Sequence, residues 1–304
     1  MILEAPPVEC PVCFVRPVQA MRLRGGENLW RCRACGLGWW NWDRVDPAAF
    51  YDRSYFQSNS HAKGYDDYAA LEPGVRRTAR SRLRRLARLL KAGVARGPSP
   101  SVGARLLDVG CGTGVFLDEA RARGWSASGV EVSAYAAEQA RQRGLEVRCG
   151  PAGAGGASDG SLDCVTLWDV IEHLARPVDV LGECASALRP GGVLALSTGD
   201  LSSLCARLSG RAWHLFNLPE HLYFFTPLAL QRALRRFGLR VAACVREVNW
   251  SPLRYLTERV GKTLTGPLPW LNRVAGDWLV PATLMDVIGL YAIKRRSAPE
   301  GVSG

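Results

Sequence analysis

Residues 104–124 read ARLLDVGCGTGVFLDEARARG, and this stretch decides the fold. A short apolar run leads into Asp108, glycines stand at positions 110, 112 and 114, and a helical pattern begins at Val115. The order predicts a strand, a glycine turn and a helix, with a backbone that lets a ligand come close at the carboxyl end of the strand. The glycine spacing differs from that of dinucleotide-binding proteins, and an acid precedes it. The turn therefore favours a ligand that carries an ammonium group.

The residues after this stretch alternate between strand-like and helix-like patterns. Residues 125–133 predict a second strand that ends at Glu131, where a carboxylate suits the two hydroxyls of a ribose. Three more strands are predicted over 146–150, 161–170 and 193–198, with helices between them and a Pro-Gly-Gly turn before the last strand. This alternation predicts a doubly wound, mostly parallel α/β sheet with right-handed crossovers.

These stretches resemble the class I S-adenosylmethionine-dependent methyltransferases. The matching segments are LLDVGCGTG, GVEVS, DGSLDCVTLWDVIEHLARP and LRPGGVLALST, in the family's order. The resemblance is strongest over 103–200 and extends through 221–241, which is similar to the last helix and sixth strand of the small-molecule and glycan branch. It implies a Rossmann-like sheet with an antiparallel final strand and S-adenosylmethionine as the cofactor. The residues that it assigns to cofactor binding are Asp108, Gly110, Cys111, Gly112, Gly114, Glu131 and Trp168.

The resemblance also implies a role for the two acids. Asp108 is expected near the methionine amino group, and Glu131 is expected on the ribose. The family usually has an acidic or polar residue after the third strand that helps to hold adenine. Here the first acid after that strand is Asp159, so backbone groups near Cys149 and Gly150 are expected to hold the base.

Four of the ten cysteines stand in two pairs, CPVC with Cys10 and Cys13 and CRAC with Cys32 and Cys35. The spacing within each pair lets both thiolates face one metal ion, and the 18 residues between the pairs allow a hairpin around the GGEN turn. The pattern predicts a structural zinc ribbon over 1–42 with no open coordination position. Metal binding would supply the folding energy of so small a module. The other six cysteines are predicted to be packing residues.

Methyl transfer to a hydroxyl is helped by a group that removes its proton, and two histidines stand in suitable places. His173 follows the fourth predicted strand in DVIEHL, and His221 lies in NLPEHLYFFT beyond the fifth. We predict that both histidines are catalytic, together with Asp169. A structural role is the alternative for each histidine. Glu172 and Glu220 each precede one of these histidines, so a bound divalent cation, as in some quinone-pathway relatives, is a further option.

Further segments complete the predicted organisation. Residues 43–100 form a bridge with aromatic residues, a linker, and an arginine-rich helix on which Ala79, Leu83, Leu86 and Leu90 share one face. The helix either docks through that stripe or uses its arginines to contact an anion or nucleic acid. The methyltransferase domain is expected over 101–296, with a lid at 201–225, an insertion at 250–284, and a tail at 297–304.

The composition limits the class of protein and the kind of partner that the chain can have. The chain has 304 residues, 47% of them hydrophobic, and a net charge of +11 that comes almost entirely from arginine. This composition is that of a globular protein. With neither a membrane-length apolar run nor a signal-peptide pattern, we expect a cytoplasmic protein, although the insertion leaves peripheral membrane contact open. The charge favours an anionic partner, and a genome-wide arginine bias is the alternative. The oligomeric state stays open.

Three functions compete. The leading hypothesis is an O-methyltransferase for a small molecule or glycan, for example a nucleotide- or lipid-linked saccharide, with Trp213 and Phe216 of the lid as candidates for stacking on the acceptor. An RNA methyltransferase is the second, since a zinc ribbon and a basic surface fit it, but LWDVIEHL lacks the N-P-P-Y-type motif. A sugar C-methyltransferase is the third, and the chain is too short for the extra domain of those relatives.

Overall fold

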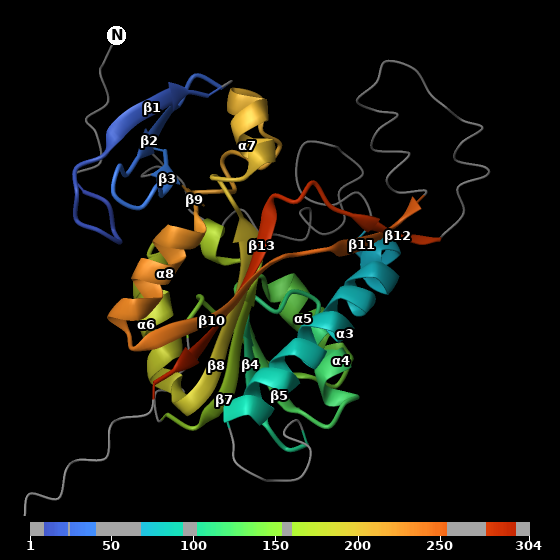
Figure 1. Ribbon diagram of the computed structural model, residues 1–304. Coiled ribbons are helices and arrows are strands. Elements are labelled where there is room, and N and C mark those ends of the chain that lie inside the picture. The colour runs from blue at the N-terminus through green and yellow to red at the C-terminus, as the bar shows by residue number, and fades with distance from the viewer. Residues whose placement is uncertain are drawn as a thin grey trace, which may run out of the picture.

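The computed structural model describes residues 9–23, 25–40, 68–93, 102–153, 160–253 and 278–295. The first part of the predicted bridge, residues 95–101 of the linker predicted over 95–104, Asp159, most of the insertion and the tail lie outside these residues. Figure 1 shows a central sheet with helices on both faces and a smaller sheet above it.

The central sheet has seven strands in the order β10-β13-β8-β7-β4-β5-β6. The strands β8, β7, β4, β5 and β6 pair with one another in parallel. The strand β13 runs antiparallel to both β8 and β10. The predicted doubly wound sheet with one antiparallel strand near its edge is therefore confirmed. The bounds are β4 (Arg105–Val109), β5 (Ser126–Glu131), β6 (Glu146–Cys149), β7 (Leu162–Trp168), β8 (Leu188–Gly199), β10 (Leu239–Arg246) and β13 (Val287–Lys294).

Two layers of helix bury the faces of this sheet (Figure 1). The helices α6 (Pro177–Ala187) and α8 (Pro227–Arg236) pack on one face, where Leu181 and Leu234 are fully buried. The other face is covered by α3 (Tyr68–Gly93), α4 (Val115–Arg121) and α5 (Ala134–Gln142). Burial of these apolar faces is the main stabilising term of the three-layer core.

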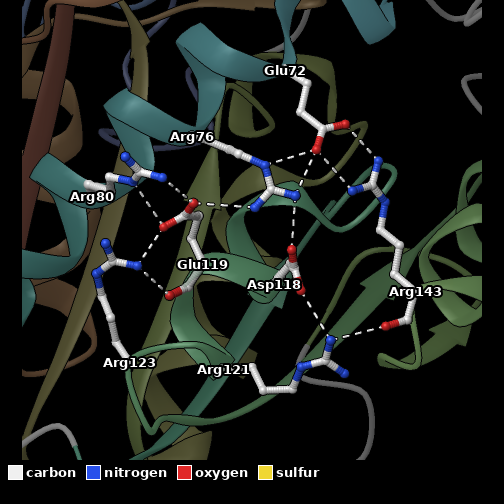
Figure 2. A network of polar contacts seen from close by, with 8 residues as sticks. All are labelled: Glu72, Arg76, Arg80, Asp118, Glu119, Arg121, Arg123 and Arg143. Atoms are coloured by element: carbon white, nitrogen blue, oxygen red, sulfur yellow. Dashed lines mark hydrogen bonds and ion pairs between the residues drawn. The ribbon is translucent and has the colours of Figure 1, made fainter.

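The helix α3 docks through the stripe that the sequence predicted. Ala79, Leu83, Leu86 and Leu90 are all buried, at 2% exposure or less. Figure 2 shows its arginines in a network with acids of the neighbouring elements. Arg76 Nη2 lies 2.9 Å from Asp118 Oδ2, and Arg80 Nη2 lies 3.1 Å from Glu119 Oε1. These arginines are thus paired within the chain, which favours the docking interpretation over an anion-contact helix.

The N-terminal cysteines sit on a small sheet with the order β1-β2-β3-β9. The predicted hairpin is confirmed, because β1 (Val18–Arg22) pairs antiparallel with β2 (Asn28–Arg31) around a turn in which Gly26 has a φ of 96°. The strand β3 (Gly38–Trp39) follows, and the fourth strand, β9 (Tyr223–Phe224), comes from the predicted lid. The sheet therefore joins the N-terminal cysteine segment to the predicted lid.

Two local expectations need correction. The helix before the fifth predicted strand ends at Ala187, and β8 already includes the Pro-Gly-Gly segment, with a break in its register against β7. Cys149 and Cys244 are exposed rather than packed in the core. The described ends of the insertion form a two-stranded sheet of β11 (Asn249–Pro252) and β12 (Leu279–Ala282). Among the described residues, none of the helices has the length and apolar character to span a membrane.

Candidate active site

The glycine turn lies at the carboxyl end of β4. Gly110, Gly112 and Gly114 all have positive φ, at 73°, 56° and 82°. A side chain at Gly110 would put its Cβ 2.5 Å from Cγ2 of Val170, so only glycine fits there. The N–H groups of Gly110 and Cys111 both donate to the Val130 carbonyl, at 2.7 and 3.2 Å. The turn is therefore held against β5, with α4 beginning directly after it.

Glu131 ends β5 beside this turn. Its Oε2 accepts the Gly112 N–H at 2.8 Å, and its Oε1 accepts the Ser133 N–H at 2.8 Å. Each oxygen keeps a further lone pair, so the carboxylate is still able to accept two hydroxyl groups. Burial raises the pKa of Glu131, and the backbone N–H bonds oppose that rise.

Asp108 is a buried acid in the neighbouring strand, and its Oδ1 accepts the Thr166 hydroxyl at 2.5 Å. Burial raises the pKa of Asp108 to about 7. The hydrogen bond from Thr166 and the charge of Arg82 oppose this rise, and the charge of Glu131 adds to it. An ammonium group beside this carboxyl would restore its charged form, as the sequence predicted for the ligand.

Trp168 and Asp169 follow at the end of β7. The indole of Trp168 lies under the guanidinium of Arg82, with 4.2 Å between the carbon of the guanidinium and the ring centroid. Its Nε1 is buried and meets no hydrogen-bond partner within the described ranges. Asp169 has a φ of 55°, and its Oδ1 accepts the Ser197 hydroxyl at 2.9 Å. Among the described residues, the indole N–H without a partner and the left-handed backbone of Asp169 make this end of β7 a candidate for ligand contact.

The two predicted histidines meet in space. Their rings lie edge to face with centroids 4.7 Å apart. Nδ1 of His173 lies 3.0 Å from the Glu220 carbonyl, and Nδ1 of His221 lies 2.8 Å from the Leu215 carbonyl. Because a carbonyl only accepts, each Nδ1 carries the proton and each Nε2 is the basic nitrogen of a neutral ring. Burial lowers the pKa of both rings, to about 3 for His173, which keeps them neutral.

A small, partly open cavity lies beside this pair. Its walls include Glu172, Thr198, Trp213, His221 and Phe224. Oε2 of Glu172 is buried there and has no hydrogen-bond partner in the part of the chain that the structure describes. Burial, with the charge of Asp169 as a lesser cause, raises the pKa of Glu172 to about 8. The cavity thus offers aromatic walls with a carboxyl group and an imidazole.

The carboxyl and the histidines also form a cluster. One ligand atom from each of Glu172, His173 and His221 lies within 4.8 Å of the others. Glu220, the other acid considered for a cation, gives its carbonyl to His173 and accepts a hydrogen bond from Asn217 through its side chain. The arrangement is suited either to proton transfer or to a cation with three protein ligands.

The four paired cysteines also come together. Their sulfur atoms lie within 4.8 Å of one another, and Sγ of Cys10 is 3.7 Å from Sγ of Cys35. The hydrogen bond from Cys35 lowers the pKa of the Cys10 thiol to about 6. Four sulfurs around one point fit a tetrahedral zinc ion, as the spacing predicted. A third group consists of Cys205, His214 and Asp286, in which Asp286 Oδ2 accepts the Trp213 indole N–H at 2.7 Å and lies 3.5 Å from Nδ1 of His214.

Comparison with known proteins identifies the family. A family model described as a methyltransferase domain matches residues 75–243. The chain belongs to the class I S-adenosylmethionine-dependent methyltransferases. The resemblance found in the sequence motifs is thereby confirmed.

Curated relatives of this methyltransferase share one name. It is 30% identical to the ubiquinone biosynthesis O-methyltransferase of Cereibacter sphaeroides over 190 residues, which cover 55% of this chain and 77% of that protein. It is 34% identical to the enzyme of the same name from Parvibaculum lavamentivorans over 175 residues, covering 52% and 67%. Magnesium protoporphyrin IX methyltransferase from Synechocystis PCC 6803, solved with bound SAH, is a structural neighbour at 16% identity and a TM-score of 0.49, covering 76% of this chain and 90% of that one.

The predicted site residues of the methyltransferase fall into two groups in the structure. The turn, Glu131, Asp108 and Trp168 gather at the carboxyl ends of β4, β5 and β7. The histidines lie with the cavity beyond β7 and β8. Sequence reasoning missed Arg82, whose Nη2 bonds the Ser197 hydroxyl at 3.2 Å and lies 3.8 Å from Asp169 Oδ2. The sequence did contain a signal for Arg82, because it falls at helical spacing between Ala79 and Leu86, on the helix face that is predicted to be buried.

Proposed function

We propose that the protein transfers a methyl group to a hydroxyl of a small molecule whose reacting part is a ring. The cavity beside His221 carries this proposal, because it combines aromatic walls with a basic imidazole nitrogen and a buried carboxyl whose Oε2 has no hydrogen-bond partner among the described residues. The relatives are O-methyltransferases by name, which supports oxygen as the methylated atom. The net charge of +11 leaves an anionic acceptor, including a linked saccharide, within this proposal.

The donor side fits S-adenosylmethionine, which supplies an activated methyl group on its sulfonium when bound. Glu131 would accept the ribose hydroxyls through its remaining lone pairs, and Asp108 would face the methionine ammonium. The backbone at Gly110, Cys111, Gly112 and Gly114 would pass close to the ligand because no large side chain intervenes at the glycines. The unpaired Nε1 of Trp168 would donate to a carboxylate or hydroxyl at the methionine end.

Proton removal falls to His221. Its Nδ1 is held by the Leu215 carbonyl, so Nε2 is left as the acceptor of the hydroxyl proton. The lowered pKa keeps the ring in its basic, neutral form at physiological pH. His173 would hold the His221 ring edge to face, and Asp169 would line the mouth beside Ser197.

The four cysteines would hold a structural zinc ion. Each thiolate supplies one ligand, so the ion has no free position for a substrate. Its role there would be structural. It would close the knuckles at Cys10–Cys13 and Cys32–Cys35 and stabilise the hairpin between them.

The deciding experiment follows label from methyl-tritiated S-adenosylmethionine into separated small-molecule, lipid, sugar and RNA fractions of a cell extract. Label in a small molecule as a methyl ether is expected, without a requirement for added Mg²⁺. Label confined to RNA would overturn the proposal, and strict Mg²⁺ dependence would reassign Glu172, His173 and His221 to a cation. His221→Asn should lower kcat on the labelled acceptor by about 10²-fold or more, while the affinity for S-adenosylmethionine stays unchanged.

A further inference from the structure

The segment that carries His221 is paired with the cysteine-bearing sheet. In β9, Tyr223 and Phe224 pair antiparallel with Trp39 and Gly38 of β3. A Cβ at Gly38 would lie 2.8 Å from Leu201 Cδ2, so the absence of a side chain at this position leaves room for Leu201 beside the strand pair. The ribbon is thus in direct backbone contact with a wall of the cavity.

Trp40 continues this contact to His221 itself. Its indole Nε1 donates to the His221 carbonyl at 2.8 Å, and Trp40 is buried. The peptide unit of His221 is therefore held from the ribbon side, while its ring is held through Nδ1 on Leu215. The basic nitrogen depends on both attachments for its position.

The opposite side of the same segment is held by the methyltransferase core. The Leu222 N–H donates to the Glu172 carbonyl at 2.8 Å, and the Leu201 N–H donates to the Phe225 carbonyl at 2.8 Å. Residues 221–225 consequently form a layer between the ribbon and the cavity carboxyl. A shift of the ribbon would move His221 relative to Glu172.

The cysteine knuckles themselves are anchored on α8. Thr226, which caps that helix, also donates its hydroxyl to the Cys35 carbonyl at 2.6 Å. Arg232 Nη1 lies 3.3 Å from Cys13 Sγ, and Arg236 Nη1 donates to the Pro11 carbonyl at 3.0 Å. Ordered knuckles therefore restrain the beginning of α8 as well as β9.

We propose that the ribbon is the outer support of the acceptor site and that Trp40 is a positioning residue for His221. The role of His221 rests on the proposed function, whereas the mechanical coupling between ribbon and segment 221–225 does not. The consequence is that the order of residues 221–225, which line the acceptor site, depends on metal binding by the four cysteines. The donor side at Glu131 and Asp108 is held by other elements.

Two variants and two controls test the coupling. Trp40→Phe removes the indole N–H that bonds His221, and Trp30→Phe removes an indole N–H of the same ribbon that has no hydrogen-bond partner among the described residues. Gly38→Val pushes β3 away from Leu201, and Ala20→Val places the same side chain on the exposed far strand β1. Zinc content, measured by atomic emission, checks that each variant keeps one ion per chain.

Hydrogen exchange of the peptide covering 220–226 is the first readout. Loss of one hydrogen bond is expected to raise its exchange about fivefold in Trp40→Phe, with a larger rise in Gly38→Val and in the chelated wild type. The controls should match the wild type. Equal exchange in the wild type, the chelated wild type and all four variants, with zinc retained by the variants, would overturn the coupling.

The ¹⁵N resonances of the His221 ring and the steady-state constants provide the second readout. Trp40→Phe should shift those resonances and lower kcat, with the KM for S-adenosylmethionine unchanged, and Trp30→Phe should do neither. Unshifted resonances would remove Trp40 from the positioning role. If the label experiment finds RNA, the proposed function fails, yet exchange and resonance shifts still decide this inference.

Discussion

At the scale of single residues, we expect Asp108 to make donor binding depend on pH. Its pKa is raised to about 7 by burial, so near neutral pH a large part of the ligand-free protein holds this proton. An ammonium group beside it favours the carboxylate and lowers the pKa, so binding releases the proton. At pH 7 we expect wild type to release up to about half a proton more than Asp108→Asn on binding. At pH 9, where Asp108 is already charged, we expect the two proteins to release the same number of protons.

Calorimetry of S-adenosylhomocysteine binding in two buffers with different ionisation enthalpies measures this difference. Subtracting the variant removes the contribution of the ligand's own amino group. Identical proton release by wild type and Asp108→Asn at pH 7 would contradict the placement of the ammonium group beside Asp108.

Glu131 gives a second prediction at the residue scale. Glu131→Gln keeps the shape of the side chain but loses the charge and one acceptor, while the Gly112 and Ser133 N–H groups still need partners. Hydrogen bonds to a charged acceptor contribute about 1.5–3 kcal/mol each. We therefore expect the Kd for S-adenosylhomocysteine to rise at least about tenfold, by calorimetry. Glu138→Gln on the exposed face of α5 is the control, and equal affinity of both variants would refute the ribose assignment.

At the scale of elements, α3 is fixed by a buried ion pair as well as by its leucines. Arg82 Nε lies 3.1 Å from Glu247 Oε2, and both side chains are nearly inaccessible. Arg82→Met would leave the buried Glu247 with Arg85, whose Nη1 is 3.4 Å away, and with the Tyr291 hydroxyl at 3.5 Å. Removing one partner of a buried pair costs about 3–5 kcal/mol, and we expect the lower end because Arg85 remains.

Urea unfolding followed by circular dichroism measures this cost. Arg84→Met is the matched control, since Arg84 is exposed on the same helix and its loss should change the free energy of unfolding by less than about 0.5 kcal/mol. Replacing Glu247 as well, in Arg82→Met/Glu247→Leu, should recover part of the loss because no lone charge stays buried. Equal stability of Arg82→Met and Arg84→Met would show that the pair does not hold α3.

At the scale of the whole molecule, the two sheets should differ in their dependence on metal. The ribbon is too small to bury a sufficient core, whereas the seven-stranded sheet is covered by helices on both faces. Chelation of zinc should expose four thiols to a thiol reagent and lower the melting temperature. It should change the Kd for S-adenosylhomocysteine by less than about twofold, since the Glu131 contacts above come from β5 and the turn. A donor affinity lost together with the metal would contradict this division.

Much of the fold was predictable because its signals are local. The glycine turn at 110–114, the end of β5 at Glu131 and the two cysteine pairs are each defined by residues close together in the chain, so spacing and alternation indicate them directly. The leucine stripe of α3 was predictable for the same reason. The role of its arginines was not, because Arg76 and Arg82 meet acids that are 42 and 165 residues away.

The sequence by itself determined most of the strands, turns and helices around the glycine turn, the methyltransferase family, and which four cysteines belong together. Only the tertiary structure decided that β9 joins the ribbon, that Trp40 holds His221 across 181 residues, and that Glu172 lines a cavity with one oxygen that has no hydrogen-bond partner among the described residues. The reason is physical: local backbone preference acts between neighbours in the chain. Burial, the pKa values that follow from it, and strand pairing across the chain depend on which distant residues fill the space around a group.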